Sequence, residues 1–556
     1  MAESGPSTAL REAGRVLGNL AARARDAFVS ALPGPRPRWA VLELRGGYPA
    51  RRQPRRLAAV EGLTGARRET SLDELTATVK ALCRNPSLEG VVLRVQGLDV
   101  DMATAFALRN LVDRLKAAGK RTVALAQSLD VTSYLAVSSV DEVVVPESAE
   151  MWIHGSALST TFMGAALAKA GVRFEKLAIR EYKNAGDPFA LPAMSEAQRR
   201  QYEAYLDGVE RTFLSGVAAG RRREASEVKA WVEEGVTSAE RARELGMIDR
   251  VAYEDEVLRE GYAPAAQAVQ FAPSRLRPPG GHVAVVSLEG TIVTGRSRRS
   301  PLPLPLFGGS MAGSESVVRA LRAAAKDPHT KALVFHVDSG GGSALASDLI
   351  WREVSRIADR MPVIAVMGQV AASGGYYVLT HATRIMAAPT TLTGSIGVVM
   401  GKFVLEEFNA RYGLNPELLK RGRYAAIMRS SEGWDEEERT LLQRYMDEVY
   451  RRFVARVAEG RRLTPAEVDE IGRGRIWSGL DALEVGLVDE LGDVEHAVSL
   501  AKRLVGLPQD ADVRDFHAPP KLVLPVGDTP EAVLQTLAPL LTERALLVPD
   551  AVLTVR

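Results

Sequence analysis

In the second half of the chain, short apolar runs alternate with longer stretches in which apolar residues recur at helical spacing. Three short, mostly apolar runs have the length of buried strands, and they lie at 283–288, 332–337 and 363–366. Three longer stretches repeat apolar residues at helical spacing, and they lie at 316–325, 344–358 and 436–460. Strands that alternate with helices imply crossover connections and a mainly parallel sheet. The pattern therefore predicts an α/β fold.

The first half of the chain repeats the second. Residues 205–213 match 445–453, and residues 246–249 match 486–489, both at a shift of 240 (445 − 205 and 486 − 246). Upstream the shift drifts only to 242 or 243. A nearly constant shift over most of each half indicates a tandem duplication.

The duplication, together with proline-rich boundaries, suggests five segments. We expect a basic amphipathic leader, an N-terminal repeat, a linker, a C-terminal repeat and a C-terminal extension, at 1–37, 38–255, 256–281, 282–505 and 506–556. A chain of 556 residues is too long for one ordinary core, which agrees with two domains.

Composition narrows the function classes. The net charge of +2 gives no argument for nucleic acid as a partner, and 46% hydrophobic with 25% charged residues is typical of a globular protein. The seven histidines show no metal-ligand spacing, so we expect no metal. No dinucleotide fingerprint is matched, and we expect no other cofactor. The single cysteine, Cys83, excludes an intramolecular disulfide.

A glycine-rich loop, Asp338–Ser343, follows the strand at 332–337 and precedes the helix at 344–358. Consecutive glycines allow backbone N–H groups to face a ligand. The loop could be a phosphate cradle or an oxyanion hole. The lysine of a phosphate-binding loop is absent, and on its own such a loop is more often a plain turn.

Ser373 lies in a comparable place. It follows the strand at 363–366 and a turn at 367–370, and Gly374 and Gly375 come directly after it. This could be an ordinary helix-capping serine, or a nucleophile at a strand-to-helix corner. A serine nucleophile needs a base, and no histidine lies in a comparable loop. A lysine could serve if burial lowers its pKa.

Lys183 is the candidate base. It lies in a loop-like stretch of the first repeat, and the matching position of the second repeat is Ala425. Conversely, the first repeat has Asp130 where the second has Ser373. The two repeats thus keep opposite halves of one pair, so we expect a site shared between them. Ser395 could hold the lysine amine as a third group.

The motifs at 371–377, 392–398 and 182–185 resemble those of the long-form, tandem-domain bacterial signal peptide peptidases, which are Ser–Lys proteases. The resemblance implies two repeats of a Clp protease/crotonase-like βαβ domain. It also implies a nucleophile, a general base and a lysine-orienting residue, which would be Ser373, Lys183 and Ser395. The oxyanion hole would be formed by the backbone N–H groups of Gly374 and of Gly341 or Gly342.

The same resemblance implies an endopeptidase that degrades cleaved signal peptides and other short, apolar, unfolded peptides. It implies a homo-oligomer, for which we expect a tetramer. The family usually has Ser-Pro-Gly-Gly in the glycine loop, where this chain has Gly340 in place of proline. A crotonase-like enzyme acting on acyl thioesters and an inactive scaffold are the alternatives.

Family members usually carry an N-terminal membrane helix, whereas this sequence has no run of about 18 apolar residues. Its basic leader could lie on a membrane surface, or it could be an exposed or docked helix. We therefore expect a cytoplasmic protein or one peripheral to the inner membrane.

Overall fold

The computed structural model describes residues 6–31, 33–52, 70–258, 261–300, 309–517, 521–522, 546–547 and 554–555. The chain forms two compact units. Unit 1 comprises residues 1–156, 210–282 and 506–513, and unit 2 comprises residues 157–209, 283–505 and 514–556. The segment 157–209 of the first repeat, which carries Lys183, therefore folds together with most of the second repeat.

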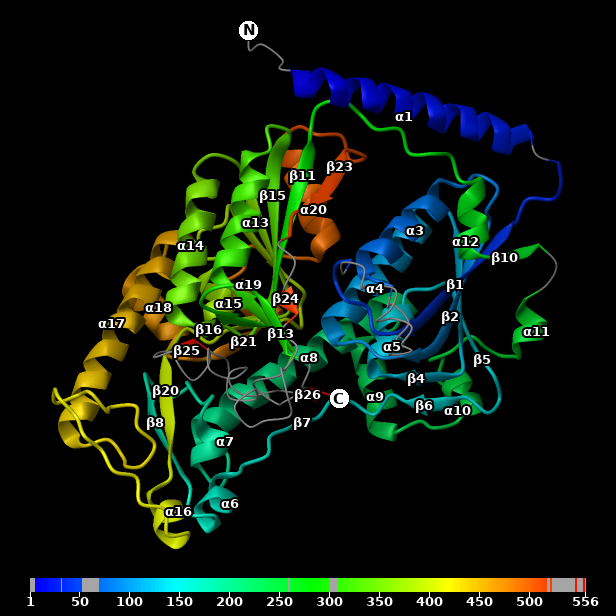
Figure 1. The fold of residues 1–556 in the computed structure, drawn as a ribbon. Helices are drawn as coiled ribbons and strands as arrows, with labels where there is room; N and C mark the ends of the chain where they lie inside the picture. Colours follow the sequence, from blue (N-terminus) through cyan, green and yellow to red (C-terminus); the bar gives the residue numbers. More distant parts are fainter. Residues whose placement is uncertain are drawn as a thin grey trace. The chain divides into compact units, whose positions relative to one another are not determined.

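Unit 1 is built on a parallel sheet whose strand order is β10-β1-β2-β3-β5-β9 (Figure 1). These strands span Tyr262–Pro264, Trp39–Gly46, Gly90–Leu98, Arg121–Ala126, Glu142–Val145 and Arg250–Val251. The residues Val91, Val92 and Leu93 are all buried, as expected for a parallel strand covered on both faces. The helices that contact this sheet or one another include α3 (Leu72–Arg84), α4 (Met102–Ala117) and α5 (Val131–Val137).

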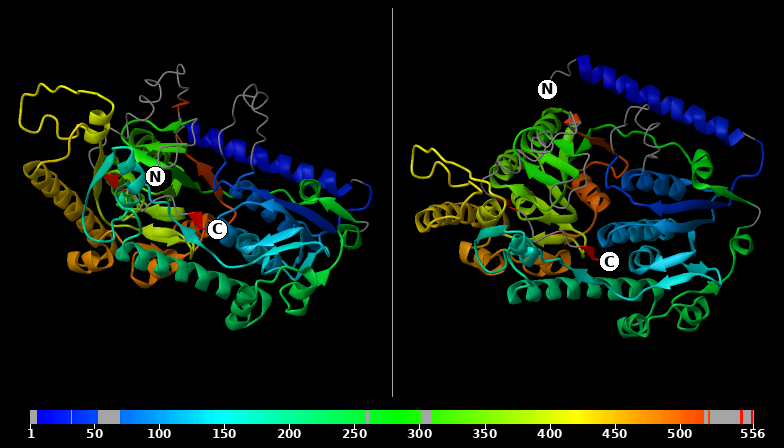
Figure 2. Two further views of the ribbon diagram at one scale, coloured as in Figure 1. Left: turned by 90° about the horizontal axis from the view of Figure 1, so that it is seen from below. Right: turned by 60° about the horizontal axis from the view of Figure 1, so that its bottom comes forward.

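Unit 2 contains a second sheet, in which five strands follow the order β21-β19-β17-β15-β11. Figure 2 shows the ribbon from two further sides in the same colours. Its strands span Ile476–Ser478, Leu392–Gly394, Val363–Ala372, Thr330–Ser339 and His282–Glu289. Strands β15, β17 and β19 are parallel, and β21 is antiparallel to β19. The helices α13, α14 and α17 span Ser314–Lys326, Ala344–Ala358 and Glu436–Arg461. The predicted α/β fold with a mainly parallel sheet is confirmed.

One strand is longer than the sequence predicts. The apolar pattern predicts a turn at 367–370 after the strand at 363–366, but β17 continues to Ala372. The extra residues are held by pairing with β19, where Val370 faces Leu392 and Ala372 faces Gly394. The strand therefore leads directly into Ser373.

Another sheet of unit 2 contains the neighbouring strands β16, β25, β20 and β8. They span Gly342–Ser343, Leu546–Leu547, Val399–Val404 and Arg173–Ala178. Strand β8, from the first repeat, pairs antiparallel with β20, from the second, along its whole length. Strand β25 pairs antiparallel with both β16 and β20.

Equivalent ion pairs recur in the two repeats. The guanidinium of Arg221 lies 2.7 Å from the Asp249 carboxylate, and that of Arg461 lies 2.8 Å from Asp489. Both partners are shifted by 240 residues, which is the shift seen in the sequence. The tandem repeat is therefore present in the packing as well as in the sequence.

Helix α1 (Pro6–Ala31) contains the amphipathic part of the leader. Within the described ranges, no helix is long and apolar enough to cross a membrane. The same residues contain no cluster of three or more potential metal ligands.

Candidate active site

Ser373 lies at the corner between β17 and the short helix α15 (Gly374–Tyr377). Its backbone has φ 55° and ψ −115°, a conformation that L residues rarely adopt. The backbone N–H of Ser373 donates to the Gly394 carbonyl at 2.8 Å, which helps to hold this corner. A strained residue at a strand-to-helix turn is how several hydrolase folds present a nucleophile.

Lys183 lies in the loop between β8 and α7 (Asp187–Ala190), and its side chain is completely buried. Its Nζ atom is 2.8 Å from Ser373 Oγ, 2.7 Å from Ser395 Oγ and 2.9 Å from the Ser395 carbonyl oxygen. The residues from opposite repeats thus meet inside one unit of one chain. The sequence alone leaves open whether they meet within or between chains.

These three contacts suit a neutral amine. A neutral lysine has two N–H groups and one lone pair. The two oxygens of Ser395 can accept both N–H groups, which leaves the lone pair of Lys183 to accept the hydroxyl proton of Ser373. Burial in general disfavours the charged form of a lysine.

Two other buried lysines, Lys120 and Lys402, have different surroundings. Burial lowers the pKa of Lys120 and of Lys402. However, the Nζ of Lys120 donates to the backbone carbonyls of Asn85 and Leu88, and that of Lys402 to two carbonyls near Trp434. Burial is therefore not the distinguishing feature of Lys183; its contact with two serine hydroxyls is.

The glycine loop lies against the residue that follows Ser373. A Cβ atom built on Gly374 would lie 3.2 Å from the Gly342 nitrogen. The N–H of Gly341 already donates to Ser339 Oγ at 3.0 Å. Of the two alternatives from the sequence, Gly342 is therefore the better candidate for an oxyanion donor beside Gly374. The role of Ser339, which also donates to the Gly290 carbonyl at 2.6 Å, is not apparent from the motif.

A turn at residues 472–475 supports the lysine loop. The N–H of Tyr182 donates to the Arg473 carbonyl at 3.2 Å, and the Arg473 guanidinium is paired with Glu181 at 3.0 Å. Burial raises the pKa of Tyr450, so its hydroxyl stays protonated and donates to Asp469 at 2.6 Å. The same hydroxyl accepts from the Arg473 N–H at 3.3 Å.

Asp130 occupies the N-cap of α5, as Ser373 occupies the N-cap of α15. A tyrosine follows each cap: Tyr134 in the first repeat, and Tyr376 and Tyr377 in the second. The hydroxyls of Tyr134 and Tyr376 donate to backbone carbonyls 240 residues apart (487 − 247), so Tyr376, rather than Tyr377, is equivalent to Tyr134. The alignment of Asp130 with Ser373 therefore rests on their shared cap position.

Two segments of the sequence match the model of a known protein family. The model of peptidase family S49 matches the chain twice, at residues 114–267 and 355–508. The two matches are 241 residues apart (355 − 114), which agrees with the duplication. Together they cover more than half of the sequence. The chain belongs to peptidase family S49. It is a serine-type peptidase, and its repeats are two copies of the family's domain.

Two relatives of this S49 peptidase match it over most of its length, and a third matches a shorter part. "Serine protease SPPA, chloroplastic" of Arabidopsis thaliana is 30% identical over 498 residues, which are 85% of this chain and 72% of the relative. "Protease 4" of Salmonella typhi is 27% identical over 462 residues, which are 79% and 73% of the two chains. "Putative signal peptide peptidase SppA" of Enterococcus faecium is 30% identical over 223 residues, which are 40% of this chain and 63% of the relative.

Proposed function

We propose that this S49 peptidase is an endopeptidase with Ser373 as nucleophile and Lys183 as general base. The observation that carries the proposal is the 2.8 Å distance from Lys183 Nζ to Ser373 Oγ in a fully buried setting. Ser395 orients the amine, since its hydroxyl and carbonyl oxygens both lie within hydrogen-bonding distance of Nζ.

In the proposed reaction Lys183 removes the hydroxyl proton of Ser373 as the oxygen attacks a peptide carbonyl. The backbone N–H groups of Gly374 and Gly342 stabilise the oxyanion, and one such donor typically contributes about 3–4 kcal/mol. Lys183 then protonates the leaving amine, and water hydrolyses the acyl-enzyme with Lys183 again as base.

The proposed substrates are cleaved signal peptides and other short, apolar, unfolded peptides. Strand β25 occupies a position between β16 and β20 through antiparallel pairing, so an extended chain fits there by backbone hydrogen bonds. Gly342, which belongs to β16, faces Leu547 in this pairing. An extended substrate in that position would run past the proposed oxyanion donor, as only an unfolded segment can.

The test is hydrolysis of an unfolded, synthetic signal-peptide remnant by the wild type and by the variants Ser373→Ala and Lys183→Met. Turnover of an acyl thioester with no peptide cleavage would instead favour the crotonase-like alternative. Absence of both activities in the wild type would favour the inactive-scaffold alternative.

We further propose a homo-oligomer, and the repeat itself supports it. Within the chain, β8 pairs with β20. At a shift of 242, β8 corresponds to residues 415–420 and β20 to residues 157–162. In the described structure 415–420 form no strand, and in 157–162 only Leu158–Ser159 pairs, with Thr554–Val555. Pairing of 415–420 of one copy with 157–162 of the next would repeat the intrachain contact head to tail and could close a ring.

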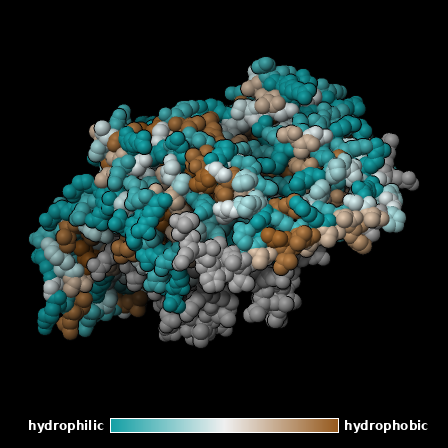
Figure 3. All heavy atoms as spheres, turned by 90° about the horizontal axis from the view of Figure 1, so that it is seen from above, coloured by the Kyte–Doolittle hydropathy of each residue, from teal (hydrophilic) through white to brown (hydrophobic). Residues whose placement is uncertain are grey.

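Exposed apolar side chains lie on or just before the segment 415–420, which would pair with the next copy. Tyr412, Leu414, Leu418 and Leu419 are exposed, and Leu419 has 95% of its surface accessible. Figure 3 shows hydrophobic side chains among hydrophilic ones at the left-hand end of the view, where the segment between α16 (Glu406–Arg411) and α17 lies. Such a patch is typical of an interaction surface.

We expect the wild type to be a tetramer in solution and Leu419→Glu to dissociate it, because a buried carboxylate would oppose the contact. Light scattering coupled to gel filtration measures the mass. Leu504→Glu, on an exposed leucine of α20 (Val494–Leu504), is the matched control and should keep the wild-type mass. A monomeric wild type, or a tetrameric Leu419→Glu variant, would contradict the proposed contact.

Peripheral contact with a membrane is a further part of the proposal. One side of α1 is held by hydrogen bonds from Asn19 and Arg25 to the segment 270–277. The apolar residues Val16, Leu17, Leu20 and Phe28 remain exposed, and at helical spacing they fall within an arc of about 120°. An exposed apolar stripe on a helix that also carries arginines suits an anionic lipid surface.

We expect the protein to sediment with vesicles that contain phosphatidylglycerol and not with pure phosphatidylcholine. The double variant Leu17→Asp, Phe28→Asp should lose this binding, because both side chains would insert into the lipid surface. Trp152→Asp, at another exposed apolar position of unit 1, should bind as the wild type does. Binding that is unchanged in the double variant would show that α1 does not contact lipid.

A further inference from the structure

A buried glutamine lies behind the lysine loop. Gln201 belongs to α8 (Glu196–Arg221), and its side chain is completely buried. Its Nε2 atom donates to the Tyr182 carbonyl at 3.2 Å and to Asn184 Oδ1 at 2.9 Å. It therefore contacts both residues adjacent to Lys183 in the chain.

The other end of the same amide reaches the strand that holds Ser395. Gln201 Oε1 accepts from the Ile476 N–H at 3.1 Å, and the preceding carbonyl, that of Arg475, accepts from the Ser395 N–H at 2.7 Å. One side chain thus joins the backbone around Lys183 to the backbone that fixes Ser395.

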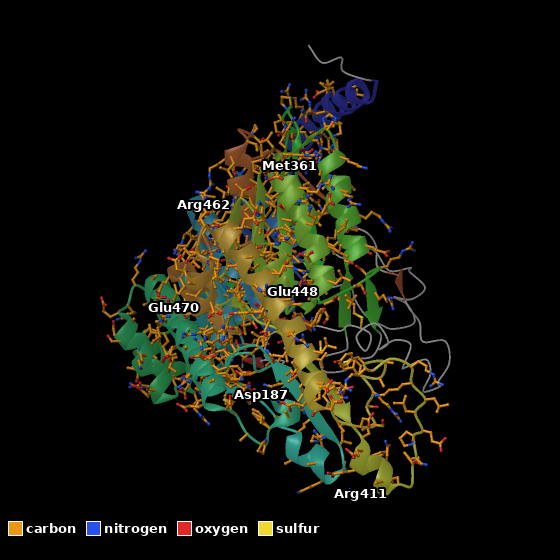
Figure 4. All side chains as sticks on the ribbon, turned by 90° about the vertical axis from the view of Figure 1, so that its left-hand side faces the viewer. Asp187, Met361, Arg411, Glu448, Arg462 and Glu470 are labelled. Atoms are coloured by element: carbon orange, nitrogen blue, oxygen red, sulfur yellow. The ribbon has the colours of Figure 1, made fainter. Side chains whose placement is uncertain are left out.

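Asn184 continues the network on the far side of the loop. Its Nδ2 atom donates to Asp187 Oδ2 at 2.7 Å, and Asp187 is paired with Lys176. Asn184 and Asp187 are both buried. Figure 4 labels Asp187 on the segment that follows β8. Because Asn184 uses its N–H groups toward Asp187 and the Glu181 carbonyl at 3.2 Å, its Oδ1 remains as the acceptor for Gln201.

The second repeat lacks the same set of residues. At the shift of 240 that applies to this helix, Gln201 corresponds to Leu441. At the shift of 242 that applies to the loop, Lys183 and Asn184 correspond to Ala425 and Ala426. The amide pair therefore occurs in the repeat that has the lysine and is missing from the repeat that does not.

We propose that Gln201 is a positioning residue that holds the Lys183 amine in register with Ser373 and Ser395, with Asn184 as its partner. This inference rests on the proposed role of Lys183 as general base. Gln201 does not touch the reacting atoms. It acts by fixing the backbone on both sides of Lys183 and the distance of that backbone from the strand at 476–478.

The test replaces Gln201 by leucine, the residue of the second repeat. We expect kcat for peptide hydrolysis to fall about 10- to 100-fold with KM unchanged, because a displaced base slows the reaction and leaves peptide binding intact. The acidic limb of the kcat–pH profile should also move, since the amine loses its fixed contacts with Ser395. A role in folding alone would change neither the profile nor kcat per folded molecule.

Gln198→Leu is the matched control. Gln198 is equally buried on the same helix, but its Nε2 donates to Tyr202 at 3.0 Å. It should keep the wild-type kcat and pH profile.

If Gln201→Leu does not fold, Gln201→Glu is the alternative variant. It keeps the shape of the side chain but places a second oxygen against the acceptor oxygens of Tyr182 and Asn184, so it should show the same loss of kcat. The positioning role would be overturned if the folded Gln201 variant had the wild-type kcat and pH profile. If Ser373→Ala were inactive at the same time, the proposed function would remain intact. An active Ser373→Ala would instead refute the proposed function.

Discussion

Ser373→Ala should abolish peptide hydrolysis, with a loss of about 10⁴-fold or more, because the nucleophile has no substitute in the site. It should also abolish covalent labelling by a fluorophosphonate probe, which reacts with activated serines. The backbone of Ser373 is held by its own hydrogen bond, from its N–H to the Gly394 carbonyl at 2.8 Å, so removal of the hydroxyl should leave the backbone in place. Thermal unfolding of the variant should therefore resemble that of the wild type.

Lys183→Met should reduce kcat by about 10²- to 10⁴-fold, the range expected for loss of a general base. Methionine has a similar length and is easily buried, so the fold should be retained. Labelling of Ser373 by the probe should slow in parallel, because an unactivated hydroxyl is a weak nucleophile. Peptide hydrolysis rates and labelling rates over a range of pH measure both effects.

Lys120→Met is the matched control for this experiment. Lys120 is also buried, but its amine donates only to the carbonyls of Asn85 and Leu88 in unit 1. Its loss should cost about 1–3 kcal/mol of stability, because two buried acceptors lose a donor. Activity per folded molecule should remain that of the wild type. Full activity in the Lys183 variant, or equal losses in both, would exclude the proposed dyad.

Much of the candidate site could be predicted from sequence because its parts are local motifs. A few residues are enough to show a glycine pair after a strand and a serine at a strand-to-helix corner. Comparison of the two repeats shows the lysine that only one of them has. Helix α14 begins and ends where the periodicity places it. Strand β15 is longer than its apolar run by only a few residues at each end.

The remaining features depend on contacts between distant residues, which no local pattern contains. Ile476 and Gln201 are 275 residues apart, and Lys183 and Ser373 are 190 apart. The extension of β17 depends on pairing with β19 in the same way. The division of the chain into two units also depends on distant contacts. Residues 157–209 belong to unit 2 because they contain β8, Lys183 and Gln201, whose partners lie in the second repeat.

Gly474→Ala should reduce peptide hydrolysis by about 100-fold or more, because the lysine loop packs directly on this glycine. A Cβ atom at Gly474 would lie 2.5 Å from the Lys183 nitrogen and 2.8 Å from its Cα, closer than real atoms approach. Gly474 is itself held in place, since its N–H donates to the Ile396 carbonyl at 2.8 Å. The backbone of Lys183 must therefore move, and a shift of about 1 Å at a catalytic group can cost 10²-fold.

Alanine at Gly474 would also introduce backbone strain, so a control variant must separate the effect of this strain from that of the contact with Lys183. Gly474 has φ +85°, and alanine in the left-handed region costs roughly 1–2 kcal/mol wherever it occurs. Gly486 has φ +78°, and a methyl group added to it would meet no atom within 4 Å among the described residues. Gly486→Ala therefore carries the same strain without touching Lys183, and its kcat/KM should stay within a few-fold of the wild type. If both variants lose activity equally while remaining folded by thermal melting, strain rather than displacement of Lys183 is the cause. A loss confined to Gly474→Ala, with slower fluorophosphonate labelling of Ser373, is the expected result, because labelling reports on the base that activates this serine.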